Sequence, residues 1–246
     1  MSVLLLALTA GAVIGLALGA LGGGGSVLAV PALIYLLGFT PVAATTASLV
    51  IVTLTSVTAL TAHARDGHVR WRTGLLFAAA GIVPAMLGGA LAARVPGELL
   101  TAGFALLAGA AALRMLRART TTEARVRPLP AAGAGAGLGG VTGLLGVGGG
   151  FLAVPALVGV LGLRMRTAVG TSLLVITVNS LAALTTRADT LTGLDWSVVA
   201  PFTAAAILAA WDGGRLATRI RAQTLQRTFA AVLLLVAALM LAEAAW

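Results

Sequence analysis

The sequence predicts an all-α polytopic membrane protein made of two inverted-topology repeats, each a glycine-broken re-entrant helix pair followed by three transmembrane helices. Three observations predict this fold: the composition, an internal repeat, and the distribution of arginine. Of the 246 residues, 59% are hydrophobic and 9% are charged, and the mean hydropathy is +1.06. A soluble domain carries about 25% charged residues, so the composition indicates a membrane protein.

A gap-free internal repeat divides the chain into two similar halves. When the sequence is shifted by 124 residues, 15–61 lies over 139–185 with 22 identities in 47 positions. Self-similarity of this kind indicates two copies of one structural unit. We therefore divide the chain into a first half at 1–118, a cytoplasmic linker at 119–130 and a second half at 131–246.

Arginine sets the predicted orientation of the two halves. All sixteen basic residues are arginines, and fourteen of them fall in four short segments: 63–72, 114–127, 164–166 and 215–227. The positive-inside rule places these segments in the cytoplasm and the arginine-poor connections outside. The segment 63–72 is then inside while its repeat counterpart is outside, so the halves are inverted, as in many transporters. We expect a multi-pass protein of the cell membrane with both termini outside the cytoplasm.

Composition also excludes several classes of function. The net charge of +9 would suggest a nucleic acid partner for a soluble protein, but cytoplasmic loops explain these arginines, so we expect a lipid bilayer and no nucleic acid. No cysteine is present, which excludes disulfides and thiolate metal sites. The sequence shows no nucleophile–base pair, metal-ligand cluster or phosphate-binding lysine, so we expect no enzyme activity, no catalytic residue, no cofactor and no metal.

The expected helices are apolar runs bounded by arginine, glycine or proline. The first twenty residues carry no charge and lack the basic region of a signal peptide, so they should form the first helix. That helix breaks in the glycine run 22–25, and a half-helix at 27–37 follows. Three spans complete the first half, at 43–62, 73–93 and 97–113. In the second half a broken helix at 143–157 precedes three spans, at 167–185, 196–214 and 224–243.

The glycine motif GALGGGGSVLAVPAL at 19–33 returns as GLLGVGGGFLAVPAL at 143–157. Each glycine costs roughly 1 kcal/mol relative to alanine in a helix, so these runs should break it. Segment 27–37 is about 16 Å long as a helix, roughly half a bilayer, so it should return to the side from which the chain entered. The first N–H groups of a half-helix lack partners and, with the helix dipole, favour a small anion. The two ends should converge near the membrane midplane.

The candidate binding residues belong to the motif or to the helices that follow it. Pro31 and Pro155 are expected about one turn into the half-helices, where a missing N–H does little harm. The helices at 44–56 and 169–180 are rich in hydroxyl groups, which donate to an oxyanion without burying a charge. The candidate substrate-binding residues are Gly22, Gly24, Gly25, Ser26, Pro31, Thr46, Ser48, Gly146, Gly148, Gly149, Gly150, Pro155, Thr171, Ser172 and Asn179.

Packing explains some of the small and polar residues equally well. Glycines allow helices to approach closely in membranes, which is the interpretation we prefer for Gly88–Gly89 and Gly133–Gly137. A single buried hydroxyl more often bonds to the i−4 carbonyl of its own helix or to a neighbouring helix. The binding interpretation therefore rests on the hydroxyl groups as a set beside the two breaks.

Three ionisable side chains also have competing interpretations. Asp212 lies in an apolar stretch, where a carboxylate can carry protons. It is about one turn from Arg215, however, so an interfacial salt bridge is the better interpretation. His63 and His68 flank Arg65 in the segment 63–72, and we interpret them as residues of a solvated loop in preference to a pH switch.

At the duplicated motif the sequence resembles the TauE/SafE family, the sulfite-exporter-like membrane transporters. The resemblance rests on G-x-G-G-G-x4-P-x-L followed by an Ala/Thr-Ser helix, present twice, and it spans nearly the whole chain. It implies export of small sulfur-containing anions such as sulfite or sulfonates. The first copy departs from the second, with Ser26 and Thr46 facing Gly150 and Gly170, so the site is expected to be asymmetric.

These observations lead to one functional prediction with alternatives. We expect a secondary transporter that exports a small anion, such as sulfite or an organosulfonate, by alternating access at the broken helices. An anion channel, or an importer of another small solute on the same fold, stays an alternative. The direction of transport and the coupling ion stay open, as does assembly into a homo-oligomer.

Overall fold

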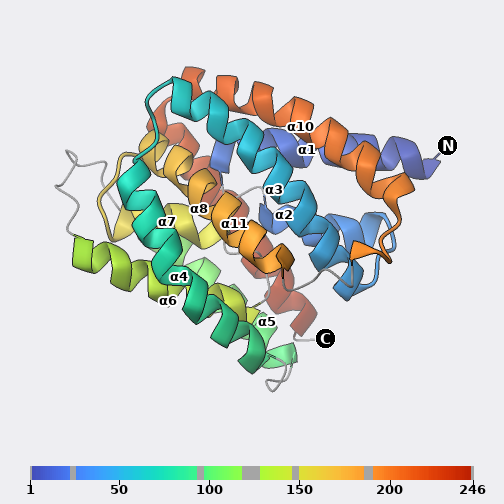
Figure 1. The fold of residues 1–246 in the computed structure, drawn as a ribbon, viewed down its shortest axis with the longest axis horizontal. Helices are drawn as coiled ribbons and strands as arrows, with labels where there is room; N and C mark the ends of the chain where they lie inside the picture. Colours follow the sequence, from blue (N-terminus) through green and yellow to red (C-terminus); the bar gives the residue numbers. More distant parts are fainter. Residues whose placement is uncertain are drawn as a thin grey trace.

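The computed structural model describes residues 2–22, 26–92, 97–117, 128–145, 150–185 and 191–244. The secondary structure of these residues is helical, without a strand among them (Figure 1). The first half contains α1 (Ser2–Leu21), α2 (Ser26–Pro31), the π-helical η2 (Ala32–Leu36), α3 (Pro41–Arg65), α4 (Trp71–Ala92) and α5 (Gly97–Arg117). The second half contains α6 (Pro128–Leu145), α7 (Gly150–Gly159), α8 (Met165–Thr185), α10 (Trp196–Arg219) and α11 (Ala222–Ala244).

The helices lie where the sequence predicts them, with two extensions that matter for the site. α3 continues to Arg65, so His63 lies within the helix and the connection to α4 is only 66–70. α10 continues to Arg219 and ends at Ile220, whose N–H donates to the Leu216 carbonyl. Apolar length alone could not show these extra turns, because polar and charged residues interrupt the apolar pattern there: His63, Arg65, Arg215, Thr218 and Arg219.

The first helix breaks at the glycine run. α1 ends at Leu21, Gly22 has a φ of +66°, and α2 begins at Ser26. Only glycine adopts this left-handed conformation without strain, so the chain changes direction here. The half-helix that follows, formed by α2 and η2, covers 26–36 and matches the expected segment closely.

The two prolines lie close to the expected position, about one and a half turns into the half-helices. Pro31 is the sixth residue of α2 and Pro155 is the sixth residue of α7. The expectation that their missing N–H does little harm is wrong, because both lie beyond the first turn. Each therefore removes a backbone hydrogen bond that an internal helical residue would make. At Pro31 the chain changes from α-helix to the π-helical turn of η2.

The two half-helices end in the same way. Gly38 and Gly162 have φ values of 71° and 64°. The next residue in each copy donates its N–H back to a carbonyl six positions earlier, from Phe39 to Leu33 and from Leu163 to Leu157, both at 3.0 Å. The matching glycines of the repeat thus form matching helix ends.

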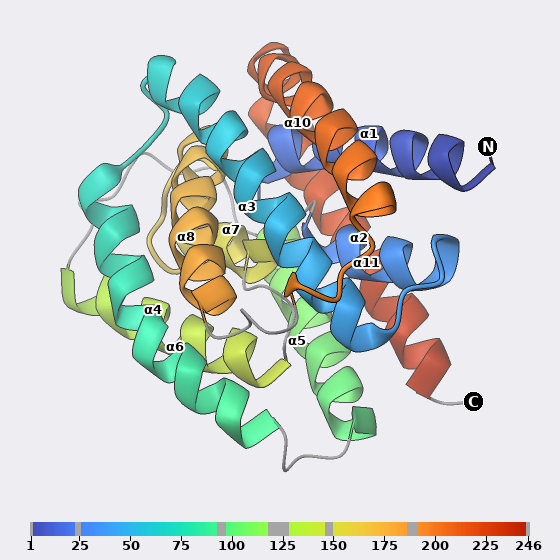
Figure 2. The same cartoon turned by 45° about the vertical axis from the view of Figure 1, so that its right-hand side comes forward.

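Two long helix pairs flank the centre of the molecule. α1 packs along α10, and α4 packs along α6; both pairs lie side by side in Figures 1 and 2. Between them α3 packs against α8, and α5 packs against α11. Each of these four pairs joins a helix of the first half to a helix of the second.

Glycines bring the flanking pairs into backbone contact. A Cβ atom on Gly11, Gly15 or Gly19 of α1 would collide with the carbonyl oxygens of three α10 residues: Phe202, Ala206 and Ala210. In the other pair, a Cβ on Gly135 or Gly139 of α6 would collide with the carbonyl oxygens of Phe77 and Gly81. We call these two contacts the α1–α10 seam and the α4–α6 seam. Small residues allow this approach, which increases van der Waals contact between helices.

The prediction that Gly133 and Gly137 serve close packing is wrong. A Cβ atom added at either position would have no atom of the described residues within 4 Å, because these glycines lie on the opposite face of α6 from Gly135 and Gly139. Gly88 and Gly89 are in α4, but their surroundings lie outside the described residues.

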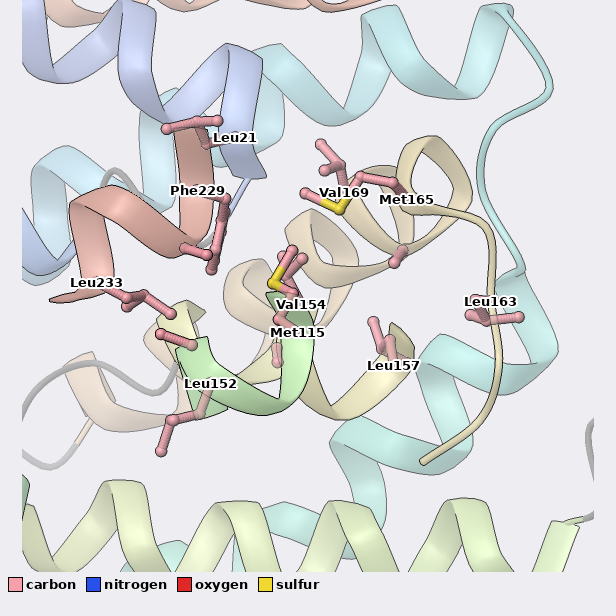
Figure 3. Packing of buried hydrophobic residues seen from close by; sticks show 14 of the residues in the cluster. Leu21, Met115, Leu152, Val154, Leu157, Leu163, Met165, Val169, Phe229 and Leu233 are labelled. Atoms are coloured by element: carbon pink, nitrogen blue, oxygen red, sulfur yellow. The ribbon is translucent and has the colours of Figure 1, made fainter. Parts of the chain in front are cut away.

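The buried core surrounds the second half-helix. Leu152, Val154 and Leu157 of α7 pack with Met165 and Val169 of α8, with Met115 of α5, and with Phe229 and Leu233 of α11 (Figure 3). A second cluster lies among α1, α2, α3, α8 and α10. Both clusters include α8, so this helix is held from several sides.

The outer surface is strongly apolar. Large side chains such as Leu5, Val13 and Leu239 are more than half exposed, as expected for residues that a bilayer would cover. Among the described residues, four helical stretches are long and apolar enough to cross a membrane: Val3–Leu21, Thr46–Arg65, Met165–Ala182 and Trp196–Leu216.

Candidate functional site

A cluster of hydroxyl groups lies where α3 and α8 pack together. Ser56 of α3 and Thr177 of α8 are buried, and their hydroxyl oxygens are 3.0 Å apart, so one donates to the other. Thr53 and Ser180 are buried as well. In the internal repeat Thr53 matches Thr177 and Ser56 matches Ser180, so each helix brings the same two residue types to this contact. We call these four residues the hydroxyl cluster.

Several of these hydroxyl groups also bond to their own helix. Thr53 donates to the Leu49 carbonyl at 2.6 Å, and Thr177 lies 2.8 Å from the Leu173 carbonyl. Ser172 donates to the Val169 carbonyl at 2.8 Å. The packing interpretation is thus correct for many single hydroxyls, and a substrate would have to replace such local bonds in order to receive the same proton.

Two oxygen atoms on α8 have no such local partner. The Asn179 side-chain oxygen and the Ser180 hydroxyl are buried and make no hydrogen bond within the described part of the chain. A buried polar atom without a partner costs about 1–3 kcal/mol. Such atoms are suited to bind a polar ligand, because the ligand recovers that cost. Asn179 was a candidate from the sequence, whereas Ser180 was not.

The break after α1 lies against α8. A Cβ built on Gly22 would be 2.7 Å from the Ser172 hydroxyl and 3.1 Å from the Val169 carbonyl, so glycine is needed for space as well as for its positive φ. Thr171, one residue before Ser172, accepts a hydrogen bond from the Arg70 N–H at 3.1 Å and so contacts the connection between α3 and α4. The structure therefore brings two candidates together at the break, Gly22 and Ser172.

The remaining candidates divide into three groups. Thr46, Ser48 and Pro155 are buried, in α3 and α7, and Pro31 is half-buried at the end of α2. Ser26 and Gly150 begin α2 and α7, but their surroundings are outside the described residues. Gly24, Gly25, Gly146, Gly148 and Gly149 also lie outside them. α2 packs against α7, which brings the two half-helices together, while the convergence of their first N–H groups stays a prediction.

His63 corrects the interpretation of a solvated loop. Its side chain is only 2% exposed, and its Nε2 lies 3.2 Å from the Gly19 carbonyl oxygen in the last turn of α1. His68 is half-buried in the connection 66–70, with its ring centroid 6.3 Å from that of His63. The sequence interpretation failed because it placed the end of α3 before His63.

Asp212 is a surface residue, and the salt-bridge interpretation is confirmed. Its carboxylate lies 3.9 Å from the Arg215 guanidinium, and both side chains are largely exposed. Trp211 next to it has the guanidinium groups of Arg65 and Arg215 near its ring, 5.6 and 5.5 Å from the centroid. These contacts, with the Arg166 bond to the Ile220 carbonyl at 2.9 Å, bring three of the arginine-rich segments together at one end of the molecule.

No group of three or more His, Asp or Glu side chains within the described ranges could hold a metal ion. The polar interior of this part of the chain thus consists of neutral hydroxyl and amide groups together with His63.

Comparison with known proteins identifies the family. The model of the family described as "Sulfite exporter TauE/SafE" matches residues 7–240. The chain belongs to the TauE/SafE family. The chain is also similar to two proteins named "Probable membrane transporter protein", from Xylella fastidiosa strains Temecula1 and 9a5c. Each is 36% identical over 248 residues, which cover 95% of this chain and 93% of the relative. No solved structure matches the chain.

Membership in the TauE/SafE family and the four long apolar helices agree on a multi-pass helical membrane protein. The family match covers both glycine breaks, α3 and α8. The breaks and the hydroxyl cluster are thus part of the segment that this TauE/SafE protein shares with its relatives.

Proposed function

We propose that this protein is a secondary transporter that exports a small anion of the sulfite or organosulfonate class by alternating access. The single observation that carries the proposal is that α8 has polar groups both at the glycine break (Ser172) and at the hydroxyl cluster (Thr177 and Ser180). We call these groups, together with Asn179, the polar lining of α8. The family description and the relatives named as membrane transporters support the transport of such a solute.

The polar lining follows one helix. Ser172 touches the break, and Thr177 lies five residues further along α8, which is about 7.5 Å of helix rise. Asn179 and Ser180 add oxygen atoms that have no local partner among the described residues. At 3.6 residues per turn, Asn179 lies about two turns from Ser172 on the same face of α8, while Thr177 and Ser180 are turned toward Ser56 of α3. The lining thus offers hydrogen bonds to a small oxyanion at two levels of α8, beside the break and at the hydroxyl cluster.

The charge of the substrate follows from the donors available. Backbone N–H groups at the start of a half-helix carry partial positive charge and favour an anion. Neutral hydroxyl groups add hydrogen bonds without the cost of burying a charged side chain. Weak, exchangeable contacts of this kind suit transport, because a substrate that is held by a buried salt bridge leaves slowly.

The packing of the helices supports the two inverted halves. α1 packs along α10 as α6 packs along α4, and α3 contacts α10 as α8 contacts α4. These are equivalent elements of the repeat, with the two halves exchanged. The proposed pseudo-two-fold axis, which exchanges the two halves, would pass through the hydroxyl cluster. It would convert the pair Ser56 and Thr177 into the equivalent pair Ser180 and Thr53. Inverted repeats place transporter sites at their common interface near the membrane midplane.

Counterflow in proteoliposomes tests the proposal. The purified protein is reconstituted with sulfite or taurine inside, and the uptake of labelled substrate from outside is measured. A carrier shows uptake stimulated by the internal substrate, whereas a channel shows none. We expect Asn179→Ala and Ser180→Ala to lower this exchange about ten-fold, the effect of losing roughly 1.4 kcal/mol of binding.

Thr9→Ala is the matched control, because Thr9 is an exposed hydroxyl that bonds only within α1. It should leave exchange unchanged. Exchange that survives both α8 substitutions would refute the proposed lining, and uptake without stimulation would favour the channel. A reporter fused after the last residue tests the orientation, since the inverted arrangement requires it to appear outside the cytoplasm.

A further inference from the structure

The buried histidine of α3 is not used by the transport site described above. His63 is the only strongly buried ionisable side chain of the described residues, and it lies in the last two turns of α3. The imidazole is enclosed by glycines of three other helices. Its Nε2 lies 3.2 Å from the Gly19 carbonyl of α1, and a Cβ on Gly170 of α8 would be 3.2 Å from the His63 Cβ. A Cβ on Gly214 of α10 would be 3.9 Å from Nε2.

The hydrogen bond determines which ring nitrogen can gain a proton. A carbonyl oxygen only accepts, so Nε2 of His63 carries a hydrogen and donates to Gly19. In the neutral ring Nδ1 is then the unprotonated nitrogen. Nδ1 is buried and makes no hydrogen bond to any described residue. His63 therefore presents a proton-accepting nitrogen inside the protein, without a competing donor from the described chain.

His68 gives this nitrogen a connection to the surface. Its ring is edge-on to the His63 ring at a centroid distance of 6.3 Å, and its side chain is half-buried. The Nδ1 atom of His68 is also buried without a partner in the described residues. The two rings thus lead from the connection between α3 and α4 to the interior.

His63 is linked to the glycine break on both sides. The Gly19 carbonyl that it contacts lies three residues before Gly22, in the turn of α1 that ends at the break. Gly170, which packs against it, lies between the two α8 residues that face Gly22, Val169 and Ser172. A charge on the imidazole would therefore act on the segment where the anion is proposed to bind.

We propose that His63 binds a proton at Nδ1 and that this proton and the transported anion favour each other's binding. The inference rests on the proposed transport function. The imidazolium adds one positive charge behind the break, so a negative solute held there is stabilised, and by linkage the solute stabilises the proton. Histidine is the side chain whose unperturbed charge change falls closest to neutral pH, so it is suited to bind and release this proton.

The elements packed around His63 carry other charged or titratable side chains that would act on its proton. On its own segment these are Arg65 and Asp66, and in the connection to α4 they are His68 and Arg70. α10 contributes Asp212 and Arg215, next to the glycine that faces the ring, and α8 contributes Arg166 in its first turn. α1 contributes no titratable side chain. His63 and His68 are the only two histidines in the chain, so replacing His68 leaves His63 as the one imidazole to follow.

The experiment follows the ring of His63 directly. Full-length protein labelled with ¹⁵N-histidine is placed in nanodiscs, and His68→Gln leaves a single imidazole signal. We expect this signal to titrate between pH 5 and 8. Sulfate, thiosulfate and methanesulfonate serve as probes, because none of them changes charge in that range. A probe that raises the unfolding midpoint should also move the His63 titration to higher pH, by a factor of about five or more in proton affinity.

Transport gives a second, independent readout. His63→Gln keeps a donor for the Gly19 carbonyl but removes the titrating nitrogen. Wild-type counterflow of thiosulfate, whose charge is constant in this range, should weaken about five-fold or more from pH 5.5 to 7.5, while the variant should keep one rate. A ring that fails to titrate, or a pH dependence that survives in His63→Gln, would overturn the proton site.

The two hypotheses fail in different ways. If His63 titrates but its midpoint is unchanged by a probe that does raise the unfolding midpoint, the coupling is wrong and the anion site stands. If no anion moves either midpoint while the ring still titrates, the linkage between proton and anion is overturned and the proposed function itself is contradicted.

Discussion

The sharpest test of the structure compares two glycines of α6 that are two residues apart. Gly139 lies in the α4–α6 seam, where an added Cβ would collide with the backbone of Gly81. A Cβ added to Gly137 would have no atom of the described residues within 4 Å. Alanine gains about 1 kcal/mol over glycine at each site from helix propensity. At Gly137 this gain should be the whole effect, so Gly137→Ala should stabilise the protein.

At Gly139 the same gain is opposed by overpacking. Insertion of a methyl group into a packed interface costs typically 1–3 kcal/mol. The upper part of that range applies here, because the nearest atoms belong to backbone and no side-chain rotation can relieve the contact. Subtracting the propensity gain leaves a net destabilisation of about 1–2 kcal/mol. The two variants should therefore differ by about 2–3 kcal/mol.

Thermal unfolding in detergent, followed by the fluorescence of the four tryptophans, measures this difference. For a chain of this size 1 kcal/mol corresponds to roughly 2–4 °C in Tm, so the midpoints should be separated by about 4–12 °C, with Gly137→Ala the higher. Equal midpoints for the two variants would show that the seam is not in backbone contact and would refute the reasoning.

Three further predictions concern the site and the surface. Gly22→Ala should lower the unfolding midpoint and reduce exchange, because φ is +66° there and the new Cβ would meet the Ser172 hydroxyl; unchanged values for both would contradict the described break. Asp212→Asn should change the unfolding free energy by less than about 1 kcal/mol and leave exchange intact, because its salt bridge is exposed; loss of exchange would instead indicate a proton carrier. A double-mutant cycle of Ser56→Ala and Thr177→Val, followed by unfolding, should give a coupling of about 0.5–1.5 kcal/mol for their hydrogen bond, and strict additivity would count against it.

The positions of the helices could be predicted from the sequence, because arginine, glycine and proline bound each apolar run. The ends of α3 and α10 could not, because helices also extend beyond the apolar part when polar residues pack on other helices. For His63 this extra turn makes the difference between a loop residue and a buried one. Its contacts come from Gly19, Gly170 and Gly214, which are far apart in the sequence and carry no side chain to signal them.

The internal repeat contains a signal for the face of α6 that forms the α4–α6 seam. Glycines recur at every second position from 133 to 139, so the composition of this stretch favours neither face. The repeat does distinguish them, since Gly135 and Gly139 match Gly11 and Gly15. At the site, hydroxyl-rich stretches were recognised from the sequence. The roles of Ser56 and Ser180 depend on how α3 crosses α8, which no local pattern contains.

The two glycine seams have a mechanical consequence. Each seam binds the first helix of one copy to the fourth helix of the other, so the duplicated sequence units are interlocked, much as in an exchanged-arm dimer. A rocking motion that preserves both seams must move rigid units that contain helices of both copies. One unit contains α1 and α10, and the other contains α4 and α6. The gene duplication boundary is therefore not the hinge, and neither copy, expressed alone, would find the partner against which its first helix is shaped.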